Sequence, residues 1–187
     1  MQTSPLNLHR SPAAGFDEPF EMLLACHERV QRMQALLLRL ADHLAAHGAD
    51  HDARQAARDV MRYFDQAGPA HHEDEERHLF PLLLAQGGPA VAAVVRRLQH
   101  DHQAMVEQWR AVRADLVEIE AGRWRPGPLG RLAEARPRWQ AYADLYAAHI
   151  EAEESQAYPA ARPLLPASAL RAMGQEMAQR RGVPPPA

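Results

Sequence analysis

The sequence of 187 residues has little of several features that mark particular classes of protein. It holds a single cysteine, Cys26, so no disulfide can form within the chain, which favours a reducing compartment such as the cytoplasm. A net charge of −3 gives no electrostatic reason to expect binding to nucleic acid or to an anionic membrane. No apolar run approaches the roughly 20 residues that span a bilayer, and the N-terminus lacks the apolar stretch of a secretory signal. We therefore expect a cytoplasmic protein without a nucleic-acid or membrane partner.

The main pattern in the sequence is the helical periodicity of its apolar residues. Apolar residues recur at 3.6-residue spacing and predict four long helices, over about 17–48, over 50–85, between the turn at 86–89 and the loop at 122–130, and over about 131–163. Pro69 should kink or break the second helix, Pro81 should disturb it again, and Pro137 should bend or delay the fourth. A short fifth helix is expected over Leu170, Met173 and Met177, with Ser168 as its N-cap and its end at Gly182. No segment alternates with period 2, so the predicted fold is an all-α, up-down-up-down bundle.

One short pattern occurs twice and indicates a functional site. The first copy is His71-x3-Glu75-Glu76-x3-Phe80-Pro81, and the second is His149-x3-Glu153-Glu154-x3-Tyr158-Pro159. The i,i+4 spacing places the histidine and the first glutamate of each copy on one helical face. A single such pair is common on helix surfaces, whereas a match of this length, including the aromatic-proline ending, indicates an internal duplication.

A further histidine precedes each copy, within the apolar stripe of an earlier helix: His27 before the first copy and His102 before the second. Two helix hairpins facing one another would bring four imidazoles and two carboxylates together. Buried carboxylates cost several kcal/mol each unless they are paired or bind a metal. Mixed nitrogen and oxygen donors favour iron, with manganese or zinc as alternatives. The expected site is a metal pair, in which each ion has two imidazoles and shares two bridging glutamates. The six candidate ligands are His27, His71, Glu75, His102, His149 and Glu153.

Helical geometry indicates whether each of the other histidines faces the site or the solvent. His72 lies about 100° from His71, and the second copy has Ile150 at the equivalent position, so His72 is expected to face solvent rather than to ligate. His43, His47 and His100 are expected to face solvent as well. His78 returns to the face of His71, but its counterpart is Gln156, so we expect it to line the site, with ligation left open.

The remaining neighbours of the predicted site are assigned to packing. Cys26 points about 100° away from His27 on a helix and is expected to pack as a small buried hydrophobe. Six aromatic residues are expected to wall the site and to limit solvent access: Tyr63, Phe64, Trp109, Trp139, Tyr142 and Tyr146.

With these motifs, the chain resembles hemerythrin-like proteins, which carry the HHE cation-binding domain, over roughly residues 17–163. The resemblance implies an antiparallel four-helix bundle around a non-heme di-iron centre (Fe2+/Fe3+) with a bridging oxo or hydroxo group. It carries the ligand roles over to His27, His71 with Glu75, His102, and His149 with Glu153. The expected organisation is a flexible arm over 1–16, the HHE domain over 17–165, a C-terminal helix over 166–182 and a tail over 183–187.

The chain also departs from the oxygen-carrying members of that family. Those have a His-x3-His pair on the third helix and an aspartate in the fourth-helix motif, whereas here the residues four away from His102 are Leu98 and Val106, and the last carboxylate is Glu153. Relatives of the symmetric kind include di-iron proteins implicated in repair of iron–sulfur clusters and in the response to nitric oxide. These typically carry a cysteine-containing N-terminal segment, and residues 1–16 contain no cysteine.

Three functions follow from this resemblance and from the site. The leading expectation is a module that binds or senses O2, NO or peroxide, or that handles iron. The alternatives are a di-iron enzyme or repair factor that turns over NO or peroxide, and a structural bundle in which the metal only holds the helices together.

Overall fold

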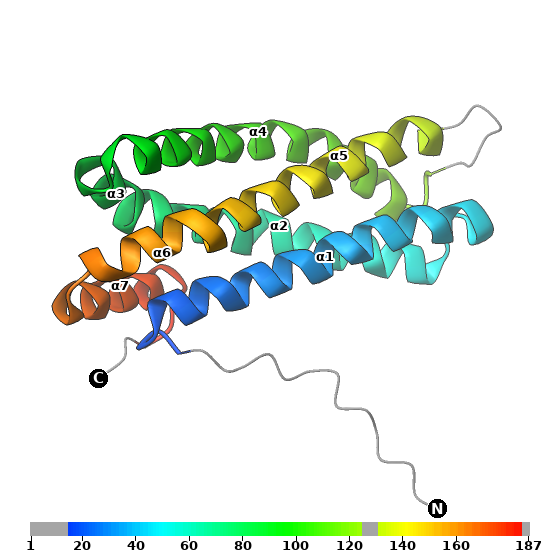
Figure 1. The fold of residues 1–187 in the computed structure, drawn as a ribbon. Coiled ribbons are helices and arrows are strands. Elements are labelled where there is room, and N and C mark those ends of the chain that lie inside the picture. Colours follow the sequence, from blue (N-terminus) through cyan, green and yellow to red (C-terminus); the bar gives the residue numbers. More distant parts are fainter. Residues whose placement is uncertain (1–14, 125–130, 185–187) are drawn as a thin grey trace, which may run out of the picture.

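The protein is helical throughout the part that the computed structural model describes, residues 15–124 and 131–184, and no strand occurs there. The four long helices are α1 (Pro19–His47), α2 (His51–His78), α4 (Gly88–Glu120) and α5 (Arg131–Ala152). They lie side by side, and both α1 and α4 contact α2 and α5 (Figure 1). The prediction of an all-α helical bundle is confirmed. None of the described helices has the length and apolar character needed to cross a membrane.

Shorter elements complete the chain at one end of the bundle. The helix α3 (Phe80–Gln86) links α2 to α4. After α5 come the π-helix η1 (Glu153–Ala157), the short helix α6 (Tyr158–Ala161) and the 3-10 turn η2 (Arg162–Leu164). The final helix, α7 (Ala167–Arg180), corresponds to the predicted fifth helix and packs against α1 and α2 (Figure 1). The prediction of Ser168 as its N-cap is wrong, because the helix already begins at Ala167 and has no side-chain cap.

The turn between α1 and α2 follows directly from local sequence. Gly48 ends α1 with a φ of 70°, a left-handed conformation that glycine adopts without the steric cost of a Cβ. Asp50 then caps α2, because its side chain accepts a hydrogen bond from the Ala53 backbone N–H at 2.9 Å. These two signals set the spacing between the first two long helices.

Prolines affect the helices less uniformly than the sequence suggests. Pro69 lies inside α2 and Pro137 inside α5, and both helices continue through them. The prediction of a break at Pro69 is therefore wrong, because packing of α2 against α1 and α4 offsets the roughly 3 kcal/mol that an interior proline costs. Pro81 does coincide with an interruption: α2 ends at His78 and α3 begins at Phe80. The expected single helix over 131–163 is likewise interrupted, by η1 just before Pro159.

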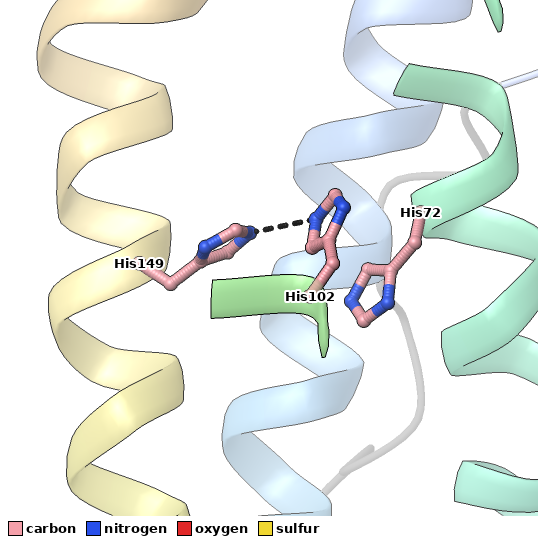
Figure 2. Close-up of side chains that lie close together, drawn as sticks. All are labelled: His72, His102 and His149. Atoms are coloured by element: carbon pink, nitrogen blue, oxygen red, sulfur yellow. Dashed lines mark hydrogen bonds between the residues drawn. The ribbon is translucent and has the colours of Figure 1, made fainter. Parts of the chain in front are cut away.

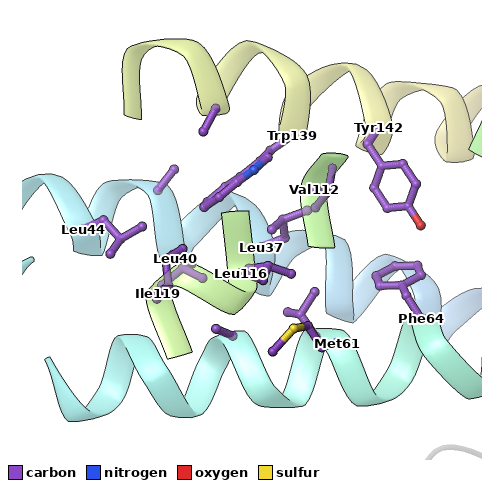
Figure 3. Packing of buried hydrophobic residues seen from close by; sticks show 14 of the residues in the cluster. Leu37, Leu40, Leu44, Met61, Phe64, Val112, Leu116, Ile119, Trp139 and Tyr142 are labelled. Carbon is purple, nitrogen blue, oxygen red and sulfur yellow. The ribbon is translucent and has the colours of Figure 1, made fainter. Parts of the chain in front are cut away.

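Two apolar clusters form the core, and together they position the polar site. One fills the bundle between the four long helices and includes Leu37, Met61, Leu116 and Trp139 (Figure 3). The other lies toward the end of the bundle with α3, α6 and α7. It includes Leu23, Cys26, Leu79, Phe80, Val95, Leu98, Tyr158 and Met177. Along the chain, each site histidine lies near the point where residues of one cluster give way to residues of the other. Apolar packing on both sides thus holds the four histidines at one level.

A buried ion pair fastens α7 to α2. Asp74 is fully buried and accepts hydrogen bonds from Arg180 at 2.8 Å and from Arg181 at 2.6 Å. Both arginines lie at the end of α7, so these bonds fix that helix beside Glu75. This contact was not expected from the sequence, because Asp74 lies between site residues without a pattern of its own.

Phe16, the last residue of the predicted N-terminal arm, lies against α7. A Cβ placed on Gly174 would come within 1.8 Å of the Phe16 carbonyl oxygen, so the chain crosses α7 where glycine alone leaves room. Residues 1–14 of the predicted arm, residues 125–130 of the predicted loop and residues 185–187 of the predicted tail lie outside the described residues.

Candidate metal centre

The six predicted ligands come together in the interior of the bundle. Each long helix contributes one histidine, α2 also contributes Glu75, and Glu153 is the first residue of η1. All six are buried, with exposed fractions between 0% and 7%: His27, His71, Glu75, His102, His149 and Glu153. They form two overlapping groups of four, each with two of the histidines and both glutamates, in which the donor atoms lie within 4.8 Å of one another.

The four imidazoles approach in two pairs through the same ring nitrogen. The Nε2 atoms of His27 and His71 are 3.1 Å apart, and those of His102 and His149 are also 3.1 Å apart (Figure 2 shows the second pair). Two nitrogens bound at right angles to one ion, each at about 2.1 Å, would be separated by about 3 Å. The spacing of each pair therefore suits two ligands of one metal ion.

Each glutamate spans the two imidazole pairs. Glu153 places one oxygen 3.1 Å from His27 Nε2 and the other 2.7 Å from His149 Nε2. Glu75 places its oxygens 3.7 Å from His71 Nε2 and 3.5 Å from His102 Nε2. Both carboxylates thus reach one imidazole of each pair, as bridging ligands between two cations would.

The opposite nitrogens of three of these rings face a second set of carboxylates. His27 Nδ1 donates to Glu154 at 2.8 Å, and His102 Nδ1 donates to Glu76 at 3.0 Å. Because an ionised carboxylate can only accept, the proton resides on Nδ1 and the Nε2 lone pair is left free to bind a metal. Sequence reasoning assigned no role to Glu76 or Glu154, although the doubled glutamate in both copies of the motif was a signal for it.

His149 follows the same arrangement with a different partner, and His71 departs from it. The Nδ1 atom of His149 lies 3.4 Å from an Asp101 carboxylate oxygen on α4. The buried Nδ1 of His71 has no hydrogen-bond partner among the described residues. Three of the four imidazoles are therefore oriented by acidic side chains.

Burial and the neighbouring charges shift the protonation of the cluster in opposite directions. Burial lowers the pKa of His71 to about 3, so this ring is neutral near neutral pH. Burial also acts to lower the pKa of His27, but the Glu153 carboxylate 3.1 Å from its Nε2, together with the charge of Glu75, outweighs burial and raises that pKa. For Glu153 burial acts to raise the pKa, and the contacts with His149 and His27 lower it below its usual range. Glu153 is thus held as an anion by its contacts with these histidines, a role that a bound cation can take over.

The buried oxygens provide a test of whether a metal fits. Glu75 Oε2 and both oxygens of Glu153 are buried and make no hydrogen bond of acceptable geometry with any described residue. Leaving such charged acceptors without donors is costly. Oxygens of this kind beside pairs of imidazole nitrogens are the donor set that iron, manganese or zinc ions bind, so the residues present fit a metal pair.

Aromatic residues that end the two motif copies pack on the site. Tyr158 donates a 2.5 Å hydrogen bond to Glu75 Oε1, and its ring stacks on His27 with the centroids 5.5 Å apart. Phe80, the equivalent residue in the first copy, stacks on His102 at the same centroid distance and has no hydroxyl. The role of Tyr158 was not anticipated, although the motif contained this Tyr/Phe difference.

Four of the six predicted wall residues line one pocket, and two lie elsewhere. Phe64, Trp109, Tyr142 and Tyr146 line a largely apolar pocket of about 340 Å³ that reaches His72 and His102. Tyr63 instead donates to the backbone carbonyl of Cys26. Trp139 donates to Asp115 and packs in the apolar cluster of Figure 3.

The expectation that His72 faces solvent is wrong. Its ring stacks on His102 with the centroids 4.0 Å apart, and it belongs to a third group of donor atoms, with His102 and His149 (Figure 2). The angular argument from His71 failed because α2 is flanked by α1 on one side and α4 on the other. A residue turned 100° from one partner therefore faces the next helix rather than water.

Cys26 and the remaining histidines discussed above lie outside these donor groups. His78 faces α7, with its Nε2 3.5 Å from Glu176. Cys26 is buried and packs in the second apolar cluster, where burial raises the pKa of its thiol. His47 and His100 are exposed, and His43 contacts Asp50 at the surface.

Comparison with known proteins agrees with this geometry. Residues 18–161 match the family described as the hemerythrin HHE cation binding domain. This match covers more than half of the chain, and the protein belongs to that family. The chain is also similar to a protein of Haemophilus influenzae described as an uncharacterized protein, with 31% identity over 170 residues, 91% of this chain and 94% of the relative. A cation-binding domain therefore occupies the part of the chain that holds all six predicted ligands.

Proposed function

We propose that the protein is a non-heme di-iron protein, with an antiparallel up-down four-helix arrangement, that binds or senses O2, NO or peroxide in the cytoplasm. The observation that carries this proposal is the pair of 3.1 Å Nε2–Nε2 contacts joined by two carboxylates that each reach both pairs. One iron would be held by His27 and His71, the other by His102 and His149, with Glu75 and Glu153 shared.

The bound iron pair, with an oxo or hydroxo bridge, would supply reversible redox chemistry and open positions for a small ligand. The residues around it orient and insulate the site. Glu154 and Glu76 hold the rings of His27 and His102 with Nε2 turned inward. The Tyr158 hydroxyl keeps its proton, because burial and the Glu75 charge raise its pKa well above the usual value, and it donates a hydrogen bond to Glu75.

The pocket favours a ligand-binding role over a purely structural one. A metal that only fastens helices needs no route from outside, whereas here an apolar pocket extends to His102. Its lining by Phe64, Trp109 and Tyr142 admits small, weakly polar molecules and limits water. An enzyme or repair factor that turns over NO or peroxide with the same centre is the second candidate, and it shares this observation.

Metal analysis together with an absorption spectrum tests the proposal. Protein purified from iron-supplied cells should contain about two irons per chain and show oxo-to-iron charge-transfer absorption when oxidised. His71→Ala and Glu153→Ala should lose iron and this absorption. Glu151→Gln, at an exposed position of α5, should keep both. Iron-free protein from such cells, or unchanged iron in both site variants, would refute the proposal, and steady consumption of NO or peroxide would favour the enzyme.

A further inference from the structure

The helix α2 directs two adjacent histidines to opposite sides of the site. His71 approaches His27, whereas His72 stacks on His102, with an interplanar angle of 16°, and lies 6.1 Å from His149 between centroids (Figure 2). His72 is therefore a fifth imidazole beside the four of the ligand set described above, and it lies on the side of His102 and His149.

A nitrogen of His72 lies near the donor atoms of His102 and His149. Donor atoms of His72, His102 and His149 lie within 4.8 Å of one another. Buried His72 Nε2 makes no hydrogen bond with any described residue. A buried polar atom without a partner is costly unless something binds it. Because the His72 ring is stacked face to face on His102, it has to rotate out of this stack before its lone pair can point at the same ion.

The two metal positions differ at this point. The second copy of the motif has Ile150 where the first has His72, and an isoleucine side chain cannot ligate. Ile150 is buried in the apolar core instead. The ion held by His27 and His71 thus has no equivalent third imidazole in the repeat.

The pocket opens on the same side as His72. Its lining includes His72, His102, Trp109 and Tyr146, and none of the other three site histidines. A small molecule that enters this pocket therefore reaches both His72 and His102.

We propose that His72 is an exchangeable third imidazole ligand of the iron held by His102 and His149, displaced when an external ligand arrives through the pocket. This inference rests on the proposed iron pair. The exchange is a ligand substitution: the iron–nitrogen bond to His72 breaks, a bond from iron to the external ligand forms, and no electron is transferred. External ligands at this iron then compete with a group of the protein itself.

Three variants separate ligation from simple obstruction. His72→Ala removes both the nitrogen and the ring, whereas His72→Phe removes the nitrogen and keeps an aromatic ring against His102. Ile150→Ala is the matched control, because it removes side-chain volume at the equivalent position of the other copy. Iron content, the visible spectrum and the equilibrium affinity for azide, a redox-inert anion, are measured on the oxidised, iron-loaded proteins.

Both His72 variants should change the spectrum and bind azide more tightly than the wild type. The increase is about tenfold if His72 occupies the iron for about nine-tenths of the time, since apparent affinity scales with the competent fraction. Free imidazole should restore the wild-type spectrum of His72→Ala, because the cavity left beside the pocket admits it. It should not restore the spectrum of His72→Phe, and Ile150→Ala should match the wild type.

Other outcomes overturn the proposal or its foundation. A spectrum and azide affinity unchanged in His72→Ala, with two irons still bound, would refute ligation by His72 and leave the proposed function standing. Tighter azide binding in His72→Ala but not in His72→Phe would show that the ring only obstructs the pocket, which also refutes ligation. Iron lost from both variants and not recovered with imidazole would assign His72 to packing. A wild type without iron would refute the proposed function itself.

Discussion

Replacing Glu153 by glutamine should remove most of the stabilisation that iron gives to the fold. Glu153 belongs to both groups of four donor atoms, and its two oxygens contact an imidazole of each pair. A neutral carboxamide cannot supply the negative charge that two cations share. The substitution should therefore weaken binding at both positions, and not at one alone.

The size of the effect follows from mass action. An ion that binds only the folded chain, at a concentration about 1,000 times its Kd, stabilises it by about 4 kcal/mol. For a chain of this length, 1 kcal/mol corresponds to about 2–4 °C in Tm, so each ion raises Tm by about 8–16 °C. If Glu153→Gln weakens binding about 100-fold, the same concentration is about 10 times Kd and contributes about 1.4 kcal/mol, or about 3–6 °C.

The assay compares thermal unfolding with and without iron for each protein, under reducing, anaerobic conditions. For each protein, the Tm without iron is subtracted from the Tm with iron, so that a change in the stability of the metal-free fold does not affect the comparison. Glu151→Gln, an exposed position two residues earlier, should show the full wild-type difference. Equal iron-dependent shifts for Glu153→Gln and the wild type would refute the reasoning, because Glu153 could not then be a shared ligand.

Three further substitutions test the surroundings of the site. Glu154→Gln should lower metal affinity about 10–100-fold in a chelator competition titration, because it weakens the acceptor that orients His27. Asp74→Ala should lower the free energy of unfolding by about 3–5 kcal/mol in a denaturant titration, because it leaves two arginines at the end of α7 without their buried partner. Gly174→Ala should cost about 1–3 kcal/mol in the same titration, because its Cβ would collide with the Phe16 carbonyl.

Each of these three substitutions has a matched control. Glu151→Gln should leave metal affinity unchanged. Asp59→Ala, at a surface position, and Ser168→Ala, at an exposed position of α7, should each change the free energy of unfolding by less than about 0.5 kcal/mol. A loss of about 1 kcal/mol in Ser168→Ala would show that Ser168 caps α7, contrary to a structure in which the helix begins at Ala167 without a side-chain cap. Wild-type stability in Asp74→Ala or Gly174→Ala, or wild-type metal affinity in Glu154→Gln, would contradict the contacts described above.

The sequence by itself determined the helical class and the composition of the central cluster. Period 3.6 in the apolar residues, with Gly48 and Asp50 as end signals, set the first long helices, because these signals act within one or two turns of backbone. The repeated His-x3-Glu motif placed His71 with Glu75 and His149 with Glu153 on inward faces, because i,i+4 spacing is a property of the helix alone. The structure brings all six predicted residues together, while their role as metal ligands stays a prediction.

Only the tertiary structure decided those features of a residue that depend on a neighbouring helix. Whether Pro69 breaks α2 depends on packing against α1 and α4, and this packing outweighs the local cost of the proline. His72 lies on α2, yet its surroundings come from α4, so its angle from His71 could not place it. The bonds from Tyr158 to Glu75 and from Arg180 to Asp74 join residues 83 and 106 positions apart. Local periodicity carries no information on contacts of this kind, because they exist only after the helices have packed.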